Sequence, residues 1–211
     1  MGLPDRRIFI QNNGVDLCAW NEVARSGYAR LVADPQVMTF ISDGKPREKE
    51  RADQEVDAFN RELQVQGWSR WAVHHSETGA FCGYAGFAQK EYGVNYGQRL
   101  FPKLWRSRVS MTATQLALEY GFLTLGFDQI HTLTNIEHTL AIRINRNYLG
   151  VGEDYGVVCE TPHGPHLRID VPRDLFLSRL ALNRQRIFSR GRLEASIPEA
   201  PPVSGSAKAI A

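Results

Sequence analysis

The segment from Trp105 to Thr112 has the position and the residue types of an anion-binding site. It lies directly before a run of residues with helical spacing, so its backbone N–H groups would open onto a helix N terminus. Aligned peptide dipoles favour phosphates at such a place. Ser110 and Thr112 are also expected to cap the helix. The candidate anion-binding residues are Trp105, Arg106, Ser107, Arg108, Val109, Ser110, Met111 and Thr112.

Four other side chains are of types that can move a proton. His74, His75 and Glu91 are candidate bases, acting directly or through a water, and Tyr148 is a candidate acid. Each also has a structural interpretation. The two histidines adjoin a turn, so one is expected to face solvent and the other to pack. Glu91 also fits a solvated loop, and Tyr148 also fits core packing.

The sequence does not predict a metal site or disulfide bonds. His163 and His166 flank a Gly-Pro turn without ligand spacing. The three cysteines, Cys18, Cys82 and Cys159, are widely spaced and form no C-x-x-C pair, which favours a reducing compartment.

Alternating helical and extended patterns would position these residues. In the first part of the chain, these patterns predict a short strand, two helices and an antiparallel hairpin. Their ranges are Arg7 to Ile10, Leu17 to Val32, Arg47 to Leu63, and the paired Trp68 to His74 and Phe81 to Phe87.

The second part predicts strands at Val94 to Phe101, Gln129 to Thr134 and Leu167 to Val171. Helices are expected over Ser110 to Leu125, broken by Gly126, and over Thr139 to Asn147, stopped at Gly150. In the first of them, one buried face is expected at Ala113, Leu116, Ala117 and Tyr120. The order predicts an α+β domain on a mixed sheet.

The last part of the chain differs in composition. Residues 1–173 are expected to form the domain and residues 174–195 a basic helix, and the Pro-, Ala- and Ser-rich residues 196–211 are expected to be disordered. The basic helix is expected to be a solvated helix packed on the domain. A contact with nucleic acid or a membrane is the alternative.

Bulk properties limit the class of protein. A chain of 211 residues with 43% hydrophobic residues fits one domain, and a net charge of +2 predicts no polyanionic partner. No stretch approaches the roughly 18 apolar residues that span a bilayer, so we expect a cytoplasmic protein without a membrane partner. Nothing in the sequence excludes a homodimer.

Several motifs together resemble the GNAT superfamily of acyl-CoA-dependent N-acetyltransferases. They are Asn95 to Ala113 with Leu118 to Phe122 and Leu125 to Ile130, Val37 to Pro46, Trp71 to Val73 with Gly79 to Gly86, and Ile142 to Ile144 with Leu149-Gly150. The likeness extends from about Arg7 to Val171 and is greatest to the branch that includes the ribosomal-protein N-terminal alanine acetyltransferases. It implies the GNAT fold, a mixed and mostly antiparallel sheet flanked by helices.

The resemblance implies acetyl-CoA as cosubstrate, no metal, and an amine-bearing acceptor. The family's loop reads Gln or Arg, two residues, Gly, one residue, then Gly or Ala, and here Trp105 begins it and Ser110 ends it. Arg108 replaces the first glycine, which lets the backbone approach phosphate closely. Arg108 either pairs with the phosphates itself or marks a decayed site.

Other site residues are carried over by position. A backbone N–H between Tyr96 and Leu100 is expected to polarise the thioester carbonyl. Asn95 takes the place of a glutamate that relatives often carry, and it cannot accept a proton at neutral pH. The family's Asn-x-x-Ser appears as His138 to Ala141, and either His138 or nearby Asn135 is expected to bond the pantetheine arm.

Three functions remain open at this point. The first is transfer of an acetyl group from acetyl-CoA to a primary amine of a small molecule or protein N terminus. The second is a GNAT-fold module that binds acyl-CoA or a partner without turnover, which Arg108 and Asn95 favour. In the third, the arginine-rich end contacts nucleic acid, which is the least expected partner.

Overall fold

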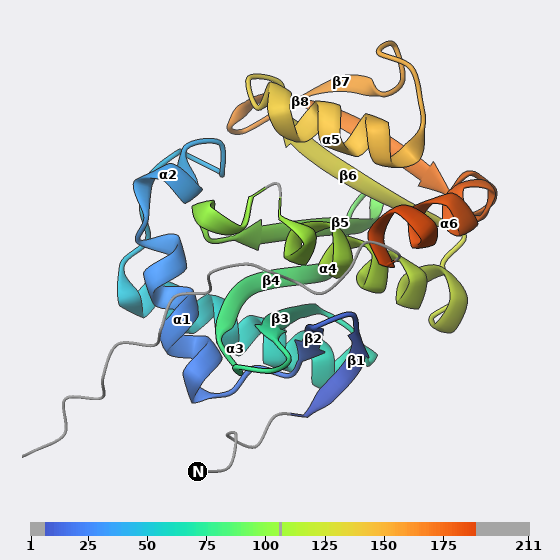
Figure 1. Cartoon of the computed structure of the whole chain (residues 1–211). Coiled ribbons are helices and arrows are strands. Elements are labelled where there is room, and N and C mark those ends of the chain that lie inside the picture. Colours follow the sequence, from blue (N-terminus) through green and yellow to red (C-terminus); the bar gives the residue numbers. More distant parts are fainter. Residues whose placement is uncertain (1–6, 106, 189–211) are drawn as a thin grey trace, which may run out of the picture.

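A computed structural model describes residues 7–105 and 107–188 (Figure 1). In these residues eight strands form one sheet in the order β1-β2-β3-β4-β5-β6-β8-β7. Neighbouring strands are antiparallel except for the parallel pair β5–β6. This is the mixed sheet that the sequence predicts, and the α+β fold class is confirmed.

The first half of the chain forms one flank of the sheet and its first four strands. The elements are β1 (Ile8–Asn12), β2 (Val15–Cys18), α1 (Glu22–Val32), α2 (Pro35–Met38), α3 (Lys49–Gln66), β3 (Arg70–His75) and β4 (Phe81–Lys90). The predicted hairpin is confirmed, with Trp71 opposite Ala85 and Val73 opposite Gly83.

One prediction in this half is wrong, because Leu17 to Val32 is not a single helix. Val15–Cys18 is a fully buried strand that pairs with both β1 and β3. The helix begins after Asn21, whose side chain accepts a hydrogen bond from the Ala24 N–H at 2.9 Å. The pairing of β2 on both edges overrode the local helical pattern.

The second half forms the rest of the sheet and the other flank. Its elements are β5 (Gly93–Leu100), a 3₁₀ turn (Pro102–Leu104), α4 (Arg108–Glu119), a π-helical turn (Tyr120–Thr124), β6 (Gln129–Asn135), α5 (Thr139–Leu149), β7 (Val157–Thr161), β8 (Gly164–Pro172) and α6 (Arg173–Phe188). Strand β7 was not predicted, since it is an edge strand with exposed Val157 and Val158 and carries little hydrophobic pattern.

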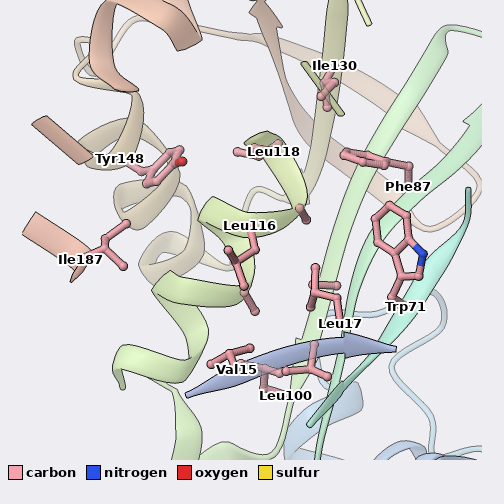
Figure 2. Close-up of a cluster of buried hydrophobic side chains, with 14 of the residues drawn as sticks. Val15, Leu17, Trp71, Phe87, Leu100, Leu116, Leu118, Ile130, Tyr148 and Ile187 are labelled. Atoms are coloured by element: carbon pink, nitrogen blue, oxygen red, sulfur yellow. The ribbon is translucent and has the colours of Figure 1, made fainter. Parts of the chain in front are cut away.

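Two hydrophobic cores lie on opposite faces of the sheet. Alternate residues of β3 and β4 point to opposite sides, so Ala72 and Tyr84 pack with α1 and α3 while Trp71 and Ala85 pack with α4. Figure 2 shows the α4 core, in which Leu116 of α4 lies among side chains from the sheet, α5 and α6. The sheet thus has one face covered by α1 and α3 and the other by α4.

Helix α6 belongs to the α4 core. Phe176 is fully buried and stacks on Phe122 with ring centroids 4.7 Å apart, and Ile187 is also buried. Asn183 donates a hydrogen bond to the Tyr148 carbonyl at 3.1 Å. The helix therefore packs on the domain, while residues 189–211, including the predicted disordered tail, lie outside the described residues.

Candidate functional site

Strands β5 and β6 separate partway along their length. Their parallel ladder pairs Asn95 with His131 and Tyr96 with Thr132. Beyond these pairs β5 continues to Leu100 and β6 to Asn135, and the two ribbons diverge (Figure 1). The separation leaves two strand edges facing a gap in the middle of the sheet.

A cavity of about 400 Å³ occupies this gap. Residues from Gly97 to Leu100 line it on the β5 side, and residues from Thr132 to Asn135 line it on the β6 side. Side chains from both faces of the sheet complete the walls, with Ser110 and Ala141 from α4 and α5 and Val37 from α2. The volume suits a small-molecule site that can be reached from two faces.

The edge of β5 supplies backbone groups to the gap. The Phe101 N–H donates to the Cys82 carbonyl oxygen of β4 at 3.2 Å. Since backbone groups alternate in direction along an antiparallel strand, those of Arg99 turn toward β4 and those of Gln98 and Leu100 toward the gap. The Leu100 carbonyl accepts the Trp105 indole N–H at 2.9 Å, whereas the backbone N–H groups of Gln98 and Leu100 are candidates to polarise a carbonyl in the gap.

Side chains of β5 hold the first turns of α4 against this edge. The Gln98 amide nitrogen donates to the Ser110 carbonyl at 2.9 Å, and its carbonyl oxygen accepts from the Ser110 hydroxyl at 3.1 Å. The Tyr96 hydroxyl donates to Thr114 Oγ1 at 3.0 Å. Sequence reasoning missed Gln98 and Thr114, although the period of two along a strand places Tyr96 and Gln98 on one face.

Among the described residues, no side chain of the N-cap position satisfies the N terminus of α4. Its N-cap is Ser107, whose side chain does not cap the helix and donates instead to the Leu104 carbonyl at 2.6 Å. The prediction that Ser110 and Thr112 are caps is wrong, because both lie inside the helix. First-turn N–H groups have no partner within a helix, so this end favours an anion.

Arg108 directs its charge away from the cavity. Its guanidinium donates to the Ile187 carbonyl in the last turn of α6 at 3.0 Å, and the residue does not line the cavity. This placement does not match the interpretation in which Arg108 pairs with phosphates.

Replacing Arg108 by Ala is expected to destabilise the protein by about 1 kcal/mol, because a helix C-terminal carbonyl loses a hydrogen bond from a charged donor. Urea unfolding measures the change. Arg186→Ala, at an exposed position in the same last turn, is the matched control and should have little effect. Equal stabilities of the two variants would contradict the role given to Arg108.

The predicted binding residues divide into two groups. The cavity is lined by Leu100, Trp105, Ser110, Met111 and His138, and also by the catalytic candidates Asn95 and Tyr148. Of the others, Val109 and Thr112 are buried in the domain, Ser107 is the N-cap, and Arg106 lies outside the described residues.

The two catalytic candidates in the cavity are held by hydrogen bonds. The Tyr148 hydroxyl donates to Gln115 Oε1 at 2.6 Å, and burial raises its pKa well above the ordinary value, so it stays protonated. The Asn95 side chain accepts from the Tyr92 hydroxyl and donates to the Tyr96 carbonyl, each at 3.2 Å.

The three candidate bases lie away from the cavity. Glu91 is exposed in the turn between β4 and β5. His74 and His75 are both buried in β3, so the expectation that one faces solvent is wrong. Burial lowers the pKa of His75, and His74 Nδ1 lies 2.9 Å from the Gly79 carbonyl oxygen.

A loop from the α1–α3 flank reaches the β6 side of the cavity. The Phe40 ring stacks on the His138 ring with centroids 4.5 Å apart, and the Ser42 hydroxyl lies 3.0 Å from His163 Nε2 in the β7–β8 turn. Burial lowers the pKa of His138, so its imidazole is neutral at physiological pH. Phe40 lies in the Val37 to Pro46 segment of the family resemblance, but no local pattern in the sequence connects it to His138.

The described residues contain neither a candidate metal site nor a helix that could span a membrane. Within residues 7–105 and 107–188, no group of three or more His, Cys, Asp or Glu side chains is arranged to hold a metal ion. No helix in that part of the chain is long and apolar enough to cross a membrane.

Comparisons with known proteins agree with this geometry. The acetyltransferase (GNAT) domain family matches residues 17–148. A GNAT-family acetyltransferase from Bacillus anthracis has a TM-score of 0.66 at 16% identity, over 79% of this chain and 99% of that one. A GCN5-related N-acetyltransferase from Brucella melitensis also has 0.66, at 14% identity, over 88% and 87%.

A third solved structure contains ligands. Spermidine N-acetyltransferase from Vibrio cholerae, in complex with CoA and spermine, has a TM-score of 0.61 at 15% identity, over 79% of this chain and 99% of that one. These likenesses concern the fold. Because the family match covers more than half of the sequence and includes β5, α4 and most of α5, the chain belongs to the GNAT acetyltransferase family.

Proposed function

We propose that this protein transfers an acetyl group from acetyl-CoA to a primary amine. The observation that carries the proposal is the gap between β5 and β6, which joins an open helix N terminus on one face to a separate flank on the other. A thioester in that gap can be approached by an amine from the α1–α3 side. The family's use of acetyl-CoA supports the choice of donor.

The cosubstrate would be held mainly by backbone groups. The first-turn amides of α4, from Arg108 to Ser110, would take the diphosphate, with the Trp105 and Ser110 side chains beside it. The pantetheine arm of acetyl-CoA would follow the cavity wall between α4 and α5, past Met111 and His138. Main-chain donors do not depend on side-chain identity, so the departure from the family's loop pattern does not remove them.

The reaction needs few side chains. The amine nitrogen forms a bond to the thioester carbon, the Gln98 N–H stabilises the developing oxyanion, and the C–S bond breaks. The amine loses one proton and the departing thiolate gains one. Tyr148 is protonated and lines the cavity, which suits a donor to the thiolate once its bond to Gln115 exchanges.

The acceptor class is an amine of a small molecule or of a protein N terminus. The resemblance to ribosomal-protein alanine acetyltransferases favours a protein N terminus, whereas the likeness to spermidine N-acetyltransferase favours a small amine. The cavity of about 400 Å³ accepts either a small amine or the first residues of a chain.

A second function is a module that binds acyl-CoA or a partner without turnover. The observation that favours it is the set of groups on the cavity wall. Among the described lining residues there is no Asp or Glu, Asn95 stands where relatives often carry a glutamate, and the Tyr148 proton is engaged by Gln115. Acetyl-CoA binding without thiol release would identify this function.

Acetyl-CoA is expected to raise the melting temperature, since a ligand specific for the folded state adds about 2.7 kcal/mol at a concentration 100 times its Kd. Differential scanning fluorimetry measures the shift, and release of free thiol with a panel of primary amines measures turnover. Pantetheine, which lacks the diphosphate of coenzyme A, is the control ligand and should bind more weakly than acetyl-CoA. No shift with millimolar acetyl-CoA would refute both acetyl transfer and acyl-CoA binding, while a shift without thiol release would leave only the second function.

A further inference from the structure

The α1–α3 face of the cavity gathers two arginines from different strands. Arg70 in β3 and Arg99 in β5 both line the cavity. Their guanidinium carbons lie 5.8 Å and 5.4 Å from the centroid of the Tyr84 ring, which lies between these strands on β4. Arg70 also lies 5.3 Å from the centroid of the Phe59 ring. The Tyr84 ring thus has a guanidinium near it from each neighbouring strand, and two like charges on one wall of the cavity favour a bound anion.

Within the described part of the chain, the charges of these two arginines are only weakly compensated, since the Glu55 carboxylate acts on Arg99 from beyond ion-pair distance. Neither forms an ion pair there, and the Nε of each is buried without a hydrogen-bond partner. Arg99 Nη1 lies 3.5 Å from the sulfur of Met38, a weak acceptor.

The nearest acidic group on that flank is already shared. The Glu55 carboxylate lies 3.4 Å from Arg51 and 3.9 Å from Arg47, and it accepts the Tyr28 hydroxyl at 2.6 Å. No Asp or Glu lines the cavity among the described residues, whereas Lys90 adds a third cation. The cavity therefore favours a negatively charged ligand group and disfavours a polycation.

Gly97 connects the arginines to the gap. It is the first residue of β5 beyond the last pair with β6, at Tyr96. A Cβ built on Gly97 would lie 3.7 Å from Arg70 Nε and 4.0 Å from the Tyr84 hydroxyl oxygen. An anion bound by Arg70 would thus lie next to the point at which the proposed acetyl transfer takes place.

We propose that Arg70 and Arg99 bind an anionic group, a carboxylate or a phosphate, of the acceptor whose amine is acetylated. This inference rests on the proposed acetyl transfer and narrows its acceptor class to short amines that carry an anion a few bonds from the nitrogen. Planar guanidinium groups suit both anions because they donate two parallel hydrogen bonds.

Matched acceptor pairs test the charge requirement and separate the two anions. β-Alanine is compared with β-alanine amide, and O-phosphoethanolamine with ethanolamine, while spermine serves as a polycation. Thiol release gives kcat/KM, and calorimetry on protein saturated with CoA gives Kd. In at least one of the two pairs, the anionic member is expected to have a kcat/KM at least about tenfold higher and a Kd at least about tenfold lower than its neutral partner. The reason is that hydrogen bonds to charged groups are the strong ones. Spermine should give background release.

Arg99→Gln and Arg70→Gln are expected to remove this preference, chiefly by raising KM for the anionic acceptor. Arg186→Gln, exposed on α6, should keep it. Unchanged acetyl-CoA binding shows that a variant is folded. If both arginine variants fail to fold, Gly97→Ala tests the proposal instead. This variant is expected to fold, because the φ of Gly97 is not positive and the added methyl meets Arg70 only at ordinary contact distance. It should raise KM more for the anionic acceptor than for the neutral one.

The two proposals fail in different ways. Equal binding and turnover of charged and neutral partners would overturn the anion site and leave acetyl transfer standing. The anion site would also be overturned if both arginine variants kept the preference for the anionic acceptor. Where Gly97→Ala replaces them as the test, an unchanged KM for the anionic acceptor would overturn it. Arginine-dependent binding of the anion without thiol release would support the anion site and refute acetyl transfer.

Discussion

Replacing Ala141 by Trp is expected to lower the affinity for acetyl-CoA by about 10- to 100-fold. Ala141 lines the cavity from α5, opposite the wall that contains Ser110. An indole at this position would occupy space that the proposed arm of the cosubstrate needs, and steric overpacking costs about 1–3 kcal/mol. Calorimetric titration of acetyl-CoA into the variant measures the loss.

Asn147→Trp is the control for this experiment. Asn147 lies on the same helix, is exposed and does not line the cavity, so the same indole there should leave affinity unchanged. Melting temperatures near that of the wild type would show that both variants fold. If Ala141→Trp binds acetyl-CoA as tightly as Asn147→Trp does, the cosubstrate lies elsewhere.

Phe176→Ala is expected to cost about 3–5 kcal/mol of unfolding free energy. Phe176 has no exposed surface and stacks on Phe122, so its removal leaves a cavity between α6 and the sheet. Urea unfolding followed by far-UV circular dichroism measures the difference. This loss of unfolding free energy is large for a helix that, from its composition alone, is expected to be a solvated basic helix on the domain surface.

Leu177→Ala provides the matched comparison. Leu177 is the next residue along α6, has 40% of its surface exposed, and should cost no more than about 0.5 kcal/mol. Similar small losses in both variants would mean that α6 is dispensable for the fold. Because Phe176 is part of the core, a truncation after Val171 would remove core packing as well as the basic segment. A loss of nucleic-acid binding in that truncated protein would therefore not by itself show that the basic segment contacts nucleic acid.

Elements with a strong local signal were predicted well. The buried face of α4 is confirmed, since Ala113, Leu116 and Ala117 are buried and Tyr120 packs against the same core. The breaks expected after helices are also confirmed. Gly67, Gly126 and Gly150 adopt φ values of +79°, +74° and +67°, a left-handed conformation that glycine adopts at little cost.

Elements that depend on distant partners were predicted poorly. The local pattern of Leu17 to Val32 did not reveal β2, which is a strand because it pairs with β1 and β3. Edge strand β7 pairs with β8 alone and has an exposed face, so it needs little hydrophobic pattern. In both cases the hydrogen bonds that define the strand come from other segments.

The sequence by itself determined the family resemblance, the order of most elements and the position of an open helix N terminus at α4. These follow from local spacing, which is written in consecutive residues. The tertiary structure decided where β5 and β6 separate, that Arg108 bonds α6, and that Arg70 and Arg99 both approach Tyr84. Each of these depends on groups at least 14 residues apart in the chain, and only packing of the whole domain brings such groups together.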